Sequence, residues 1–91
     1  MSLNSLVMLE HGGVCRLLAF LLDHPEGIAR AQYRQSPLAL GSRAADRDHL
    51  LLFEAQLIHA VDHPKKLLFG LTEKGKQVAL KLREIANLLK K

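Results

Sequence analysis

A mainly helical domain with one small β-hairpin is the fold class that this sequence predicts, and three observations support it. Leucine-rich stretches repeat apolar residues every three or four positions, which is the periodicity of an amphipathic helix. Two short apolar runs flank the turn-forming segment 62–66, which is typical of a hairpin. The chain has 91 residues, 48% of them hydrophobic, which fits a single domain over 1–91.

The N-terminal quarter predicts helical structure. Asn4 or Ser5 can cap a short helix over 6–9, which a glycine pair then punctuates. Apolar residues recur at i, i+3, i+4, i+7 and i+8 within 14–22, which predicts an amphipathic helix. The two pieces can also form one helix with a glycine joint. The segment 23–27 contains proline and glycine and therefore ends the helix.

The middle of the chain predicts two further helices. The segment 28–35 has the composition of a short helix, and Pro37 stops it. The stretch 38–41 is predicted to be a turn that places its leucines in the core. Ser42 is a good N-cap residue for a longer helix that ends near Gln56.

The C-terminal part predicts a hairpin followed by a long helix. The segments 57–61 and 67–71 look extended, and the Asp-His-Pro-Lys-Lys turn between them is polar. Thr72 is a plausible N-cap for a helix over 72–91, since Glu73 in the first turn interacts favourably with the helix dipole.

Three stretches carry a resemblance to a known family. The first is LEHGGVCRLLAFLLDHPEG, which resembles the first helix of archaeal winged-helix regulators. The second is LGSRAADRDHLLLFEAQLI, which resembles a recognition helix and the phrase usually written Leu-Glu-Glu-x-Gly-Leu-Ile. The third and most specific is LFGLTEKGKQVA, which is similar to the wing-exit signature of MarR-like and PadR-like regulators. Together they cover roughly residues 9–80 and imply a winged helix-turn-helix domain. The heptad pattern described below adds a C-terminal dimerisation helix to this prediction.

The sequence departs from the family pattern in three places. Gln56 stands where the family has glycine, so we expect either a left-handed residue that costs about 1 kcal/mol or a different cap. His49 falls near a position that is usually apolar, and the segment 33–40 is atypical of a second helix.

The resemblance implies that the helix beginning at Ser42 enters the major groove of DNA. Arg43 and Arg47 are four residues apart and share one helix face, where arginine can donate two hydrogen bonds to guanine. Asp46 is expected to orient one of them, and the second helix and the hairpin tip are expected to contact phosphates. The residues predicted to contact DNA are Arg30, Gln32, Arg34, Ser42, Arg43, Asp46, Arg47, His63, Lys65 and Lys66.

Two alternatives apply to these residues. The arginines can instead pair with Asp46, Asp48 or Glu54 on a solvated helix, and the lysines can simply keep the hairpin tip soluble. Unpaired acids on this helix would also face a polyanion at a cost in free energy.

The C-terminal helix carries an apolar seam with steps of 4, 3, 4, 3 and 4 residues from Leu71 to Leu89, which is an a/d heptad pattern. The residues predicted to form a dimer contact are Val78, Leu82, Ile85 and Leu89. Alternatively, the helix packs on its own domain, to which Leu80 and Leu88 can contribute.

The predicted function is sequence-specific binding of double-stranded DNA by a homodimer that regulates transcription. A net charge of +4 fits a polyanionic partner, and one tyrosine and three phenylalanines are too few for a surface that stacks single-stranded bases. The alternative is a winged-helix module that contacts proteins and binds no DNA, which the acids on the third helix favour.

Other classes have weaker support. A single cysteine, Cys15, allows no intramolecular disulfide, fits a reducing compartment and suits a small buried apolar residue. The sequence has no CxxC, HxxxH or HExxH motif, so we expect neither a metal nor a cofactor. The candidate metal ligands in question are Cys15, His11, His24, His49, His59 and His63.

An enzyme and a membrane protein are also not expected. There is no glycine-rich phosphate loop and no nucleophile with a base at motif spacing, so no catalytic residue is predicted. No apolar run approaches the ~18 residues of a membrane span, and the N-terminus lacks the charged region of a signal peptide. A soluble, cytoplasmic protein is the expectation.

Overall fold

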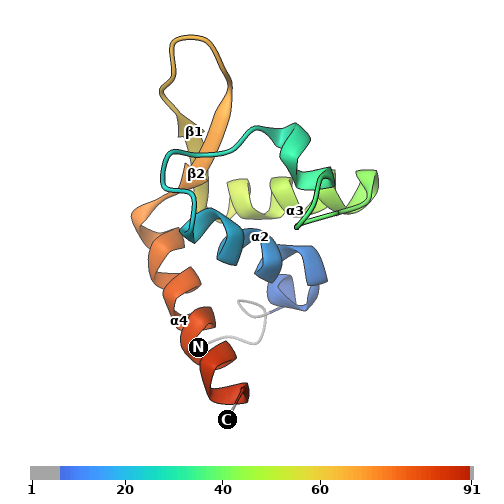
Figure 1. Ribbon diagram of the computed structural model, residues 1–91, viewed down its shortest axis with the longest axis vertical. Helices are drawn as coiled ribbons and strands as arrows, with labels where there is room; N and C mark the ends of the chain where they lie inside the picture. The colour runs from blue at the N-terminus through green and yellow to red at the C-terminus, as the bar shows by residue number, and fades with distance from the viewer. Residues whose placement is uncertain (1–6, 91) are drawn as a thin grey trace.

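The computed structural model describes residues 7–90, and its elements confirm the predicted class of a mainly helical domain with one hairpin (Figure 1). The elements in chain order are η1 (Met8–Glu10), α2 (Gly12–Leu22), η2 (Arg30–Arg34), α3 (Ser42–Glu54), β1 (Ile58–Val61), β2 (Leu68–Leu71) and α4 (Glu73–Leu89). The cap predicted at Asn4 or Ser5 lies outside the described residues. Within them, a 3-10 turn precedes α2, and His11 separates the two.

The core forms around α2, which lies between α3 and α4 (Figure 1). The predicted apolar stripe of this helix is buried as expected; its members are Val14, Leu17, Leu18 and Leu21. Leu38 and Leu40, from the predicted turn before α3, are each only 3% exposed and complete the core beside it. None of the helices within residues 7–90 is long and apolar enough to cross a membrane.

The predicted second helix over 28–35 is wrong in its extent. Only a 3-10 turn, η2, forms there, because Ile28 is committed to a different partner. Its N–H and C=O exchange hydrogen bonds of 2.9 and 2.8 Å with the C=O and N–H of Phe69 in β2. This bridge holds Ile28 extended beside the hairpin, so a helix cannot begin at this position.

The hairpin and the turn that leads into it match the prediction. β1 pairs antiparallel with β2 in the register Ile58↔Leu71 to Val61↔Leu68. Each strand begins one residue later than predicted. Before the hairpin, Gln56 adopts a φ of 63°, so the left-handed alternative for this residue is the one that the chain uses.

The N-terminus of α4 closes the hairpin, and Thr72 caps the helix as predicted. Its Oγ1 accepts a hydrogen bond of 3.0 Å from the Gly75 N–H and donates one of 2.7 Å to the Gln56 carbonyl. Lys74 Nζ donates to the carbonyl of Ala55 at 3.0 Å, just beyond α3. The Thr-Glu-Lys-Gly segment therefore joins the end of α3, the hairpin and the start of α4 at one point.

Candidate nucleic-acid interface

Helix α3 presents one face to the core and the other to solvent. Its buried residues are Ala45, Asp48 and Leu52. The exposed residues lie on the opposite face at helical spacing; they are Ser42, Arg43, Asp46, Arg47, Leu50, Phe53 and Glu54. The predicted recognition surface is therefore open along the whole helix and is not packed inside the molecule.

The N-terminus of α3 differs by one residue from the prediction. Gly41, and not Ser42, is the N-cap residue, and no side chain caps the helix there. Ser42 is the first helical residue, and its Oγ accepts a hydrogen bond of 3.1 Å from Nη1 of Arg34. Since the first N–H groups of α3 have no side-chain cap, this end of the helix retains its attraction for an anion such as a phosphate.

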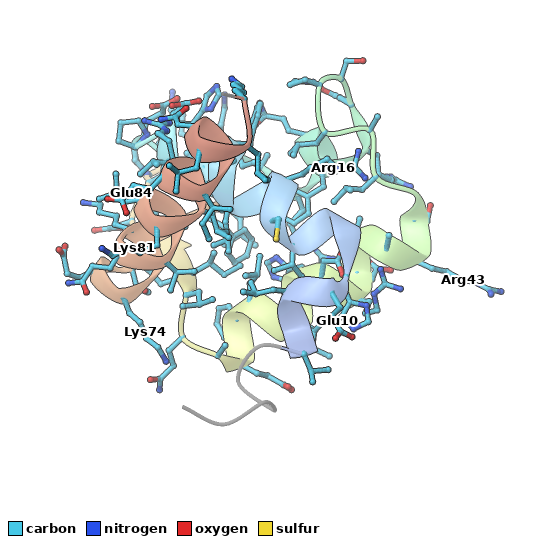
Figure 2. All side chains as sticks on the ribbon, turned by 90° about the horizontal axis from the view of Figure 1, so that it is seen from below. Glu10, Arg16, Arg43, Lys74, Lys81 and Glu84 are labelled. Atoms are coloured by element: carbon cyan, nitrogen blue, oxygen red, sulfur yellow. The ribbon has the colours of Figure 1, made fainter. Side chains whose placement is uncertain are left out.

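Arg43 is the most accessible of the predicted base-contacting residues. It is exposed and points away from the body of the molecule (Figure 2). Among the ion pairs that the described part of the chain forms, none involves Arg43. Its guanidinium is thus free to donate two parallel hydrogen bonds to a planar acceptor edge.

Arg47 is held by an acid on its own helix. Its Nε donates to Oδ1 of Asp48 at 3.0 Å, and the Arg47 side chain is 49% exposed whereas that of Asp48 is fully buried. Asp48 was expected on the surface, but its spacing from Ala45 and Leu52 places it on the apolar face. The pairing alternative is therefore realised for Arg47, while half of this side chain remains accessible.

The buried carboxylate of Asp48 lies against the first turn of α2. A Cβ at Gly13 would lie 3.1 Å from the Asp48 carboxyl carbon and closer still to Oδ2, so only glycine leaves room for the acid. Oδ2 has no hydrogen-bond partner among the described residues. The N-terminal end of α2, with its partial positive charge, and Arg47 are the two features that stabilise this charge.

Asp46 does not orient either arginine of α3, which corrects the prediction. Its carboxylate pairs with Arg30 of η2, with 2.7 Å between Nη2 and Oδ1. The reason is position: Asp46 lies on the edge of α3 that faces η2. The side chains are 44% and 77% exposed, so water screens this pair.

η2 and the start of α3 form a shallow groove of about 400 Å³, which contains several predicted contact residues. Its polar lining consists of Arg30, Arg34, Ser42 and Asp46. Gln32, also predicted to contact DNA, instead folds back, and its Oε1 accepts a hydrogen bond of 2.9 Å from the Ala29 N–H. Gln32 therefore supports the turn, and the arginines provide the charge of the groove.

The hairpin tip carries two lysines on a turn that His63 shapes. Nδ1 of His63 accepts hydrogen bonds from the backbone N–H of Lys65 at 3.1 Å and of Lys66 at 3.0 Å. Nδ1 of the imidazole is thus used within the turn, while the His63 side chain remains exposed. Both lysine side chains are exposed, so the tip presents two positive charges to solvent.

No protein-family model and no curated protein sequence matches this chain. Among solved structures, the crystal structure of SSV1 F-93 is similar, with a TM-score of 0.70 and 23% sequence identity. The match covers 86% of this chain and 89% of that chain. The fold is a winged helix.

In this winged helix, α3 is the helix that precedes the hairpin, and β1–β2 forms the wing. An aromatic cluster joins α3 to the wing. Tyr33 and His49 form its central hydrogen bond, and neither was among the residues predicted from the sequence to contact DNA. Oη of the fully buried Tyr33 lies 2.9 Å from Nδ1 of His49. The ring of His49 meets Phe69 of the wing edge-on, with 4.5 Å between centroids, and lies 6.1 Å from Phe53.

Burial sets the protonation of this cluster. It raises the pKa of Tyr33 to about 12, so the hydroxyl keeps its proton at neutral pH and shares a hydrogen bond with the imidazole of His49. Burial, together with the positive charge of Arg30, lowers the pKa of His49, and Asp46 partly opposes this. The cluster therefore connects α3, η2 and the wing through uncharged side chains.

The histidines and the cysteine do not gather into a site. Within residues 7–90, no group of three or more histidine, cysteine or acidic side chains could hold a metal ion. His24 has a local partner, since its Nδ1 lies 2.8 Å from the Phe20 carbonyl. Cys15 is half-buried, its Sγ lies 3.5 Å from the Leu9 carbonyl, and burial raises the pKa of its thiol.

Proposed function

We propose that this winged helix binds double-stranded DNA sequence-specifically and regulates transcription as a homodimer. The observation that carries the proposal is the open outer face of α3, with the unpaired guanidinium of Arg43 at its N-terminal end. In recognition helices this end approaches the base edges, and a bidentate arginine–guanine contact contributes about 1–3 kcal/mol of discrimination. No catalytic chemistry is proposed for any residue of the chain.

Phosphate contacts would come from the surfaces on either side of α3. Arg34 lies beside the uncapped N-terminus of α3, and Lys65 and Lys66 lie at the tip of the wing. With one phosphate neutralised by each of these three cations in each protomer, the slope of log K against log salt should be about −5 for a dimer. This slope counts the phosphates that the protein neutralises.

The proposed dimer contact lies nearer the C-terminus of α4 than the heptad pattern predicts. Val78 and Leu82 pack partly against the core of their own domain, as Gly75 and Ala79 do fully. Leu80, Ile85, Leu88 and Leu89 are instead 48%, 52%, 68% and 80% exposed. The last turns of α4, which project beyond the body in Figure 1, are therefore the surface that a second copy would cover.

The dimer has a direct test. Leu82 is a poor target because its replacement would also disturb the core, whereas Ile85→Asp alters only the exposed part of the helix. Light scattering should give a dimer for the wild type at micromolar concentration and a monomer for Ile85→Asp. Asn87→Asp adds the same charge at an exposed position nearby and should remain dimeric. A monomeric wild type contradicts the proposed dimer.

DNA binding is tested by mobility shift with genomic fragments at two salt concentrations. Arg43→Ala is the decisive variant, because Arg47→Ala would also leave the buried Asp48 without its partner and destabilise the fold. Lys81→Ala is the matched control; it removes one positive charge from α4, on the opposite side of the molecule (Figure 2). The specific complex should weaken tenfold or more in Arg43→Ala and little in the control.

A protein-contact module is the second candidate, and one observation favours it. Two arginines of the interface are already paired with acids, Arg30 with Asp46 and Arg47 with Asp48. Weak DNA binding that is unaffected by Arg43→Ala would support this candidate over DNA recognition. The assignment to MarR-like or PadR-like regulators rests on the three sequence stretches and stays a prediction.

A further inference from the structure

The outer face of α3 changes character along its length. Its N-terminal half carries Arg43, Asp46 and Arg47, whereas its C-terminal half carries two large apolar side chains, Leu50 and Phe53. Leu50 is 56% exposed and Phe53 is 48% exposed. Single exposed apolar residues are common on protein surfaces, but these two lie one turn apart on the surface already proposed to contact DNA.

The two apolar side chains continue the line of the arginines. Leu50 follows Arg43 by seven residues and Arg47 by three, so all three share one face of the helix. At a rise of 1.5 Å per residue, the path from Arg43 to Phe53 is about 15 Å, comparable to four or five base-pair steps of 3.4 Å. A helix that places Arg43 on a base edge therefore also directs Leu50, and at the edge of the same face Phe53, toward the same groove.

Phe53 is held in a defined position by the wing. Its ring is perpendicular to that of Phe69, at an angle of 80° with 6.5 Å between centroids, and lies at 26° to that of His49. Phe69 is only 7% exposed and belongs to the bridge that fixes Ile28. The exposed part of the Phe53 ring is thus presented from a rigid base, in the angle between recognition helix and wing.

Within the major groove, the one apolar group on a base edge is the methyl group of thymine. We infer that Leu50 and Phe53 contact thymine methyl groups, about three to five base-pair steps from a guanine contacted by Arg43; this rests on the proposed function. The acids on the same face support base edges over phosphates as the partner. Asp46 and Glu54 are both exposed there, and a carboxylate is repelled by phosphates.

Uracil substitution isolates the methyl group. The preferred duplex is first selected from a randomised pool, and each thymine is then replaced singly by uracil, which lacks only the 5-methyl group. At one or two positions, wild-type affinity should fall about fourfold per methyl, the value that about 0.8 kcal/mol per buried carbon corresponds to. Leu50→Ser should bind the thymine duplex that much more weakly and show no further loss when uracil replaces the thymine that Leu50 contacts.

Two controls keep the outcome clear. Arg43→Ala should lose affinity for thymine and uracil duplexes by the same factor, because it acts on a different base. Leu50 is not part of the core, so Leu50→Ser should retain the wild-type circular dichroism, whereas Phe53→Ser also removes a contact with Phe69.

The failures are distinguishable. Failure of the wild type to bind any duplex overturns the proposed function and this inference with it. A selected duplex that binds tightly but loses less than twofold in affinity with uracil at every thymine position overturns the inference alone. A selected site without thymine about three to five base-pair steps from the guanine does the same.

Discussion

Replacing Gly75 with alanine should destabilise this winged helix, although alanine is the better helix former. Gly75 lies buried in the first turn of α4, where the chain leaving α3 passes over it. An added Cβ would lie 2.9 Å from the carbonyl carbon of Leu57, 3.2 Å from Cδ2 of Leu71, and closer still to the Leu57 carbonyl oxygen. Because the two nearest obstructing atoms belong to the backbone of Leu57, the start of α4 and the segment after α3 must separate.

The magnitude follows from what that separation disturbs. Overpacking of this kind costs about 1–3 kcal/mol. The Leu57 carbonyl accepts a hydrogen bond of 3.0 Å from Thr72, whose side chain caps α4, and loss of an N-cap costs about 1 kcal/mol. The higher helix propensity of alanine returns about 1 kcal/mol. The expected net loss is about 2 kcal/mol, which for a domain of this size lowers Tm by about 8–16 °C.

Urea unfolding followed by far-UV circular dichroism measures this loss, with Gly41→Ala as the matched control. Gly41 has no heavy atom within 4 Å of an added Cβ, and its φ of −66° suits alanine. Weaker N-capping by alanine should cost at most about 1 kcal/mol there. A Gly75→Ala variant as stable as the wild type, or less affected than Gly41→Ala, would refute the close approach of α4 to the segment after α3.

Three further predictions concern charge. Asp46→Asn should strengthen DNA binding, because it removes a negative charge from the outer face of α3 and releases Arg30. Fluorescence anisotropy should show a salt slope steeper by about 0.9 per protomer. Unchanged affinity would mean that this edge of α3 does not face DNA. The free energy of unfolding should fall as the pH drops below about 6.5, the ordinary pKa of histidine. Burial lowers the pKa of His49 in the folded protein, so the unfolded chain takes up the proton first and stability is greatest above that pH. In urea titrations at several pH values, His49→Gln should flatten this part of the stability curve. Lys65→Ala/Lys66→Ala should reduce the salt slope by about 1.8 per protomer without altering the preferred sequence, and a changed preference in a randomised-pool selection would assign base contacts to the wing.

Elements governed by local signals were predictable from the sequence. The cap at Thr72 and the polar turn between two apolar runs depend on residues close together in the chain, and both form as expected. The left-handed Gln56 was one of two alternatives, and the family pattern pointed to its position. These features needed no knowledge of the tertiary structure.

The failures depend on contacts between distant segments. Ile28 became extended because Phe69, far along the chain, pairs with its backbone, and no local pattern reports such a partner. The burial of Asp48 differs from this case, because the local sequence did contain a signal for it. Its spacing from Ala45 and Leu52 places it on the buried face of α3, and the charge of its side chain concealed this periodicity.

The sequence also did not show which residues of the α4 seam pack on their own domain and which stay exposed. The heptad seam gives Val78 and Ile85 equivalent positions, but Val78 is partly buried against the core, whereas Ile85 is exposed. A repeat marks one face of a helix and does not say how far the rest of the domain reaches along it. Figure 1 shows that the domain ends before α4 does.

Under the proposed function, the ion pairs on and beside α3 differ in strength, and this difference predicts different roles for the arginines. The Arg30–Asp46 pair is exposed and contributes at most about 1 kcal/mol, so a phosphate can compete for Arg30. Asp48 is fully buried, and loss of its partner would cost several kcal/mol, so Arg47 stays bound to it. Arg43 is in neither pair and can engage a base at no cost in internal contacts. The acids also repel phosphates wherever no matching base is in place, so the same arrangement weakens non-specific binding more than specific binding and favours sequence discrimination over raw affinity.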